Sequence, residues 1–121
     1  MKVSDLLALN QAYKALSNGG HKFPFKVSLI IANNLANLVP VQQIDAGQLK
    51  ELAEKHGIKG NSFSTESAEG VKVFTELNAL RDQEAGEVDL KPIEAKDVEN
   101  IEGLSPEALS FLIQFNLLTV L

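Results

Sequence analysis

The sequence contains no cysteine. This absence excludes disulfide bonds, a thiolate nucleophile and zinc held by cysteine, and it fits a reducing compartment. The two histidines, His21 and His56, lie in or beside expected loops and have no partner ligand at a metal-binding spacing. Because zinc usually takes several cysteine or histidine ligands, we expect no metal and no cofactor, and surface or capping roles for both histidines.

Long apolar runs are also missing. No segment approaches the roughly 20 apolar residues that a membrane-spanning helix needs. Asp5 interrupts the first apolar stretch and no small-residue cleavage site follows it, which is not the pattern of a signal peptide. We therefore expect a soluble, intracellular protein that is not secreted and does not enter a membrane.

Motifs for catalysis and nucleotide binding are absent as well. The sequence has no Gly-x-Ser-x-Gly elbow, no Walker loop and no dinucleotide fingerprint, and several serines occupy expected caps or loops. The segment Gly57-Ile58-Lys59-Gly60 superficially matches the loop with which KH domains clamp nucleic acid, but the required strands are missing on both sides. A helix end followed by a turn explains both glycines. We expect no enzymatic activity and no catalytic residues.

The charge is distributed unevenly along the chain. Residues 1–60 hold seven lysines against four acids, a net charge of +3, and residues 61–121 hold four basic residues against twelve acids, a net charge of −8. A nucleic-acid-binding protein normally presents a concentrated basic face, so we expect no nucleic-acid partner. The acidic cluster near Glu94, Asp97, Glu99 and Glu102 lacks the glycine and ligand spacing of a calcium loop. It indicates a solvated acidic face or a surface for a basic partner.

The residues that are present predict one mainly helical domain covering residues 1–121. Ser4 can cap a first helix whose apolar residues recur at three- and four-residue steps, and glycines end it near residue 20. These apolar residues are Leu6, Leu9, Tyr13 and Leu16. A last helix should begin at Ser105 and Pro106, a cap followed by proline, with Leu109, Leu112, Ile113 and Phe115 on it.

Between these two helices we expect an antiparallel helical hairpin of residues 26–57 against 66–85. Pro40 should kink or briefly break the first of these helices near Val39, because proline removes a backbone hydrogen bond. Thr65 could cap the second helix. Its inward residues are predicted to be Val71, Phe74, Leu77, and Leu80 or Arg81.

Residues 87–93 alternate polar and apolar side chains, which predicts a short β segment. The best candidate for a partner strand is the segment around residues 23–26. The predicted fold class is therefore mainly α with a minor β component.

The C-terminal stretch, residues 111–121, is apolar at eight of its eleven positions and leaves almost no polar helix face. It could thread into the core, or it could form an interface that another subunit or a partner covers. We favour the interface, because so short a chain has limited inner surface. The candidate interface residues are Phe111, Phe115, Leu117, Leu118, Val120 and Leu121.

The order of these features resembles a family of short tailed-bacteriophage proteins of unknown function, encoded among phage structural and lysis genes. The matching segments are Phe25-Lys26-Val27-Ser28 before the long helix, Lys55-His56-Gly57 at its end, and Glu87-Val88-Asp89-Leu90 after the second helix. The likeness covers residues 1–93. The family has no assigned catalytic residues, so the resemblance transfers none.

The resemblance implies a phage or prophage origin, with the protein in the bacterial host cytoplasm or in the virion. It leaves two classes of function. The first is a non-enzymatic structural or assembly protein that works as a homo-oligomer or with a phage or host protein partner. The second is a small effector that binds and inhibits a host protein.

Overall fold

The structure is a computed structural model that describes residues 1–58 and 67–119. Its helices are α1 (Val3–Asn18), α2 (Phe25–Lys55), α3 (Ala68–Arg81), the 3-10 turn Ala95–Asp97 and α4 (Pro106–Gln114). Its strands are β1 (Ile93–Glu94) and β2 (Leu118–Thr119), which pair in parallel. The prediction of a mainly helical protein with a minor β component is confirmed.

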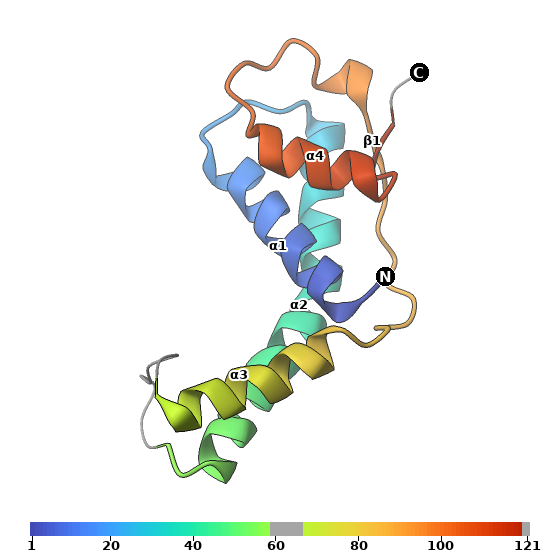
Figure 1. Ribbon diagram of the computed structural model, residues 1–121. Helices are drawn as coiled ribbons and strands as arrows, with labels where there is room; N and C mark the ends of the chain where they lie inside the picture. The colour runs from blue at the N-terminus through green and yellow to red at the C-terminus, as the bar shows by residue number, and fades with distance from the viewer. Residues whose placement is uncertain (59–66, 120–121) are drawn as a thin grey trace.

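Helix α2 runs through two parts of the molecule (Figure 1). Its N-terminal half lies beside α1, which also packs against α4, and these elements form what we call the body. Its C-terminal half lies beside α3, and these two segments project from the body as an arm. The predicted hairpin therefore involves only the C-terminal half of α2.

Helix α1 begins at Val3, so the prediction that Ser4 caps it is wrong. The carboxylate of Asp5 accepts a hydrogen bond of 3.0 Å from the backbone N–H of Lys2 and so fixes the first turn. A carboxylate in the first turn also interacts favourably with the helix dipole. After the helix, Gly20 adopts a positive φ of 74°, a conformation that glycine tolerates best.

Helix α2 is 31 residues long and continues through Pro40, so it does not break near Val39. Its ribbon changes direction in the middle instead (Figure 1). Pro40 is exposed, as is Ala36, whose carbonyl would have accepted the missing N–H. Because water can reach this side of α2, the lost hydrogen bond does not end the helix.

Helix α3 is rotated relative to the prediction. Ser67 caps it by accepting a hydrogen bond of 3.0 Å from the backbone N–H of Gly70, whereas Thr65 lies outside the described residues. Gly70, Val73 and Leu77 are buried, but Val71 is 51% exposed. The predicted inward position is confirmed for Leu77 and is wrong for Val71. The small Gly70 lies on the inward face, a position that a search for large apolar residues misses.

The β segment pairs differently from the prediction. Only Ile93 and Glu94 form a strand, and their partners are Leu118 and Thr119 at the other end of the chain. The predicted pairing with residues 23–26 is wrong. Residues 25 and 26 already belong to α2, where the helix uses their backbone groups.

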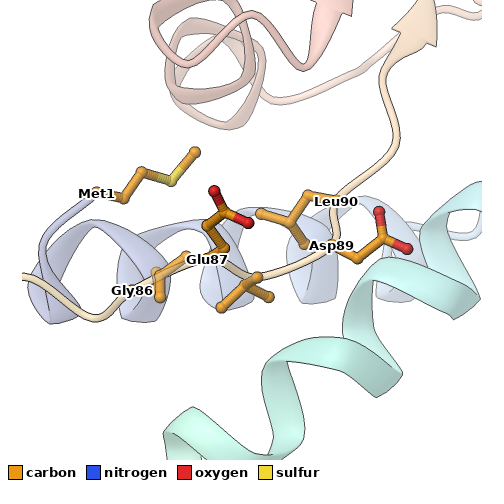
Figure 2. A pocket seen from close by; sticks show the side chains of 7 residues that line it. Met1, Gly86, Glu87, Asp89 and Leu90 are labelled. Carbon is orange, nitrogen blue, oxygen red and sulfur yellow. The ribbon is translucent and has the colours of Figure 1, made fainter.

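The segment before β1, residues 86–92, forms an extended strap that runs past Met1 (Figure 2). Two asparagines of α2, Asn34 and Asn37, hold it by hydrogen bonds to its backbone. The strap thus connects the end of the arm to β1 at the top of the body (Figure 1).

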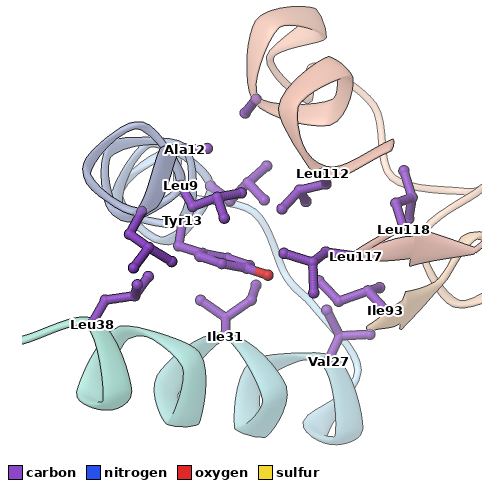
Figure 3. Close-up of a cluster of buried hydrophobic side chains, with 13 residues drawn as sticks. Leu9, Ala12, Tyr13, Val27, Ile31, Leu38, Ile93, Leu112, Leu117 and Leu118 are labelled. Atoms are coloured by element: carbon purple, nitrogen blue, oxygen red, sulfur yellow. The ribbon is translucent and has the colours of Figure 1, made fainter. Parts of the chain in front are cut away.

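The apolar core lies in the body, between α1, the N-terminal half of α2 and α4 (Figure 3). The predicted face of α1 is fully buried there, together with Val27 and Ile31 of α2 and Leu112 of α4. The core also contains Leu117 and Leu118 from the C-terminal segment. A second, smaller group, Ala53, Val73 and Leu77, is buried in the arm and does not join this core.

Candidate interaction surface

The sequence of α2 contains no charged residue from position 27 to position 44, a run of 18 residues. A helix with one covered and one solvated face normally carries charged or polar residues on the solvated face. The inner face of α2 is accounted for, because Val27, Ile31 and Leu38 are buried in the body. The lack of charge on the opposite face needs a separate explanation.

The outer face of α2 is exposed along this uncharged run and at Phe25 just before it. Phe25 is 81% exposed, Leu29 49% and Val39 42%. Steps of three and four residues place positions on one side of a helix. The outer face consists of Phe25, Leu29, Ala32, Ala36, Val39 and Pro40, all of them exposed.

This outer face differs from the scattered apolar residues found on any protein surface. It is continuous over about 22 Å, since fifteen helical steps of about 1.5 Å separate Phe25 from Pro40. Ala32 and Ala36 at its centre carry only methyl groups, which allow another backbone to approach closely. Phe25 at one end offers a large aromatic side chain of the kind that anchors protein interfaces. The arrangement suits contact with another helix.

The C-terminal residues predicted to form an interface are divided by the structure. The helix ends at Gln114, and Asn116 turns the chain with a positive φ of 59°. The backbone N–H of Leu117 then donates a hydrogen bond of 2.7 Å to the carbonyl of Leu112. Leu117 and Leu118 are consequently buried in the core of this chain, because the turn and the pairing of β2 with β1 direct them inward.

The other predicted interface residues lie in three different situations. Phe111 is 38% exposed, and Phe115 is half-buried against the core. Val120 and Leu121 lie outside the described residues. Phe111 borders a groove of about 420 Å³ between α1 and α4, which Ala8, Ala15 and Ser105 also line.

Both histidines contact other residues of the chain. His21 packs edge-on against Phe23, and its ring lies so close to Gly19 that an added Cβ there would be 2.6 Å from Nε2. His56 follows the last turn of α2, and its Nε2 lies 3.4 Å from a carboxylate oxygen of Glu76 on α3. A hydrogen bond from Lys55, together with the nearby His56, lowers the pKa of Glu76. These contacts join the two helices of the arm.

The acidic segment after β1 contacts basic side chains. The ammonium group of Lys26 lies 3.5 Å from Asp97 and 3.8 Å from Glu94, and that of Lys96 lies 3.1 Å from Glu94. Hydrogen bonding to Glu94 raises the pKa of Lys96. Glu99 and Glu102 are exposed. Within residues 1–58 and 67–119, no three acidic or histidine side chains gather where they could hold a metal ion.

Two further findings bear on the setting of this surface. None of the helices in the described part of the chain has both the length and the apolar character to cross a membrane. Comparison of the chain with protein-family models, with curated proteins and with solved structures finds no match.

Sequence reasoning did not identify the outer face of α2, although its signal was available in the uncharged run. It also missed Asn34, which lies among Ile31, Leu35 and Leu38 at helical spacing and is fully buried. A polar residue inside an apolar stripe indicates a buried hydrogen-bonding partner.

Proposed function

We propose that this chain is a non-enzymatic phage or prophage protein that acts through protein–protein contacts, with a structural or assembly role in the virion. Copies of the chain associate through the outer face of α2. The observation that supports this contact is the exposed, uncharged outer face of α2 from Phe25 to Pro40. The proposed phage origin rests on the resemblance of residues 1 to about 93, and from it we infer a location in the host cytoplasm or the virion.

The absence of charge on this face allows a second copy of the chain to occupy it. Each chain carries a formal net charge of −5, so charged surfaces of two copies repel each other. The outer face of α2 contributes no charge to that repulsion. Two copies can bury it against each other without placing an unpaired charge in the interface, which would cost several kcal/mol.

The substitution Ala36→Glu tests this contact. It places a carboxylate at the centre of the outer face, where an interface would bury it, and glutamate is a good helix former. We expect the wild-type protein to be oligomeric at high micromolar concentration and the variant to be monomeric, as measured by light scattering after size-exclusion chromatography.

The matched control is Ala79→Glu, which makes the same change at an exposed alanine of α3. It should leave the wild-type oligomer intact. A monomeric wild-type protein, or an Ala36→Glu variant that associates as the wild type does, would refute the self-association.

A second candidate function is that of an effector that binds and inhibits a host protein. The observation that favours it is the exposed acidic surface of the second half of the chain, where Glu87, Asp89, Glu99 and Glu102 have no ion pair within the described residues. Capture of a single host protein that is lost when Glu99 and Glu102 are changed to glutamine would support this function. Association with virions or assembly intermediates would support the first.

A further inference from the structure

One backbone edge of the strap already forms hydrogen bonds with other parts of the protein. The side-chain amide of Asn34 donates a hydrogen bond of 2.9 Å to the carbonyl of Lys91, and its Oδ1 accepts one of 2.9 Å from the N–H of Lys91. Asn37 donates a hydrogen bond of 2.8 Å to the carbonyl of Asp89. The two asparagines thus take the place of a neighbouring strand.

The hydrogen bonds along this edge of the strap continue into the β-sheet. The N–H of Ile93 donates a hydrogen bond of 2.8 Å to the carbonyl of Leu117, next to β2. Residues 89, 91 and 93 therefore all have backbone partners on the protein. Asn34 is fully buried and also donates to the hydroxyl of Tyr13 at 2.9 Å, so the strap is held by a rigid support.

The opposite edge of the strap is free. In an extended chain, successive residues direct their N–H and C=O groups to opposite sides. Val88 and Leu90 alternate with the residues held by the asparagines, and no hydrogen bond among the described residues involves their backbone groups. These strong donors and acceptors remain available for water or for a partner chain.

A groove runs beside this free edge. It has a volume of about 650 Å³ and is lined by Met1, Leu6 and residues 86–90. Met1, Glu87 and Leu90 lie around this opening, and Glu87 contributes a carboxylate to it (Figure 2). The groove therefore offers apolar side chains and one carboxylate next to unpaired backbone.

The charge around the groove is negative. Lys2 neutralises Asp82 at 2.8 Å, and the N-terminal ammonium group neutralises Glu84 at 3.1 Å. Glu87 and Asp89 are exposed and have no ion pair within residues 1–58 and 67–119. A segment that pairs with this edge would gain from a basic residue opposite Glu87.

We propose that the free edge of the strap binds an extended segment of a partner protein by adding a β-strand to it. The segment alternates apolar residues, which contact Met1 and Leu90, with basic residues, one of which lies against Glu87. Main-chain hydrogen bonds provide the affinity in this mode of recognition, and alternate side chains provide the specificity. Because Asn34 and Asn37 already hold the strap in an extended conformation, little ordering of the strap accompanies binding.

Amide hydrogen exchange tests the edge directly. In the free protein, the Lys91 amide should be protected, whereas those of Val88 and Leu90 should exchange rapidly. The probe is the hexapeptide acetyl-Val-Lys-Val-Lys-Val-Lys-amide at about 1 mM, a concentration that reveals even weak binding. We expect it to slow exchange at Val88 and Leu90 by at least about tenfold.

Two controls separate strand pairing from simple charge attraction. The same hexapeptide with every backbone nitrogen methylated keeps its charge but cannot donate hydrogen bonds, and it should give no protection. The variant Glu87→Lys should weaken binding of the unmodified peptide by about tenfold or more, whereas Glu102→Lys, the same change at an exposed carboxylate that does not line the groove, should not.

Three results would overturn the proposal: no protection at about 1 mM peptide, equal protection by the methylated peptide, or equal weakening by Glu87→Lys and Glu102→Lys. The strap site does not depend on the outer face of α2. Ala36→Glu should therefore leave peptide binding unchanged, and the failure of either proposal can be recognised without the other.

Discussion

At the scale of single residues, the most unusual feature of the core is a buried polar pair. Tyr13 and Asn34 are both fully buried, and the amide of Asn34 donates to the hydroxyl oxygen of Tyr13. Burial raises the pKa of Tyr13 to about 12, because it disfavours the charged phenolate, while the hydrogen bond from Asn34 acts in the opposite direction. Burial is the larger effect, so Tyr13 stays neutral in the folded protein well into the alkaline range.

The ionisation of Tyr13 can be measured without interference. It is the only tyrosine, and the chain has no tryptophan, so the phenolate absorbance reports this residue alone. We expect a folded-state midpoint near 12. An unfolded tyrosine ionises near 10, so the contribution of Tyr13 to stability is complete below about pH 10 and is lost as the pH rises from about 10 to 12.

Denaturant unfolding at a series of alkaline pH values checks the sign of this effect. The Tyr13→Phe variant should show a shallower loss of stability between about pH 10 and 12. A midpoint near 10 in the folded protein would contradict the burial of Tyr13.

At the scale of elements, α3 shows how a small residue changes the face that a helix buries. The inward residues Gly70, Val73 and Leu77 are separated by three and four positions, as an amphipathic helix requires. The predicted face advances from Val71 in steps of three, through Phe74, and also includes Leu77. The predicted and the observed inward faces of α3 therefore share Leu77, and only the contact with α2 shows which face is buried.

Alanine substitutions should separate these two faces. Leu77→Ala removes a fully buried side chain from the arm and should lower the free energy of unfolding by about 2–4 kcal/mol. Val71→Ala changes a half-exposed side chain and should alter it by less than about 0.5 kcal/mol. Chemical denaturation measures both, and similar losses in the two variants would contradict the orientation of α3.

At the scale of the whole molecule, the body and the arm differ in how they are stabilised. The body has an apolar core to which α1, α2, α4 and the C-terminal segment contribute. The buried apolar residues of the arm, within the described chain, are Ala53, Val73 and Leu77. The guanidinium of Arg81 forms two hydrogen bonds of 2.8 and 2.9 Å with the carboxylate of Asp45, which joins α3 to α2 near the body.

This difference predicts that the arm opens before the body unfolds. Regions with few buried apolar contacts exchange their amide hydrogens through local opening at a lower free energy than the core. Amides in the middle of α3 should therefore exchange faster than those in the middle of α1, when each is corrected for its intrinsic rate. Equal protection in the two helices would show instead that the molecule unfolds as one cooperative unit.

The sequence by itself determined the features that depend on neighbours along the chain. It placed the four main helices, the cap at Ser105, the glycine after α1 and the buried face of α1, because caps, glycines and three- to four-residue spacing act over a single turn. The serine cap is confirmed by its hydrogen bond to the backbone of Ala108.

Only the tertiary structure decided which distant segments meet. Lys91 of the strap is hydrogen-bonded to Asn34, 57 positions away in the sequence. Strand β1 pairs with the C-terminal segment rather than with residues 23–26. The same pairing took Leu117 and Leu118 into the core, whereas the outer face of α2 stayed exposed. Apolar spacing shows that a residue prefers to be covered, but the element that covers it depends on long-range packing, for which local sequence carries little signal.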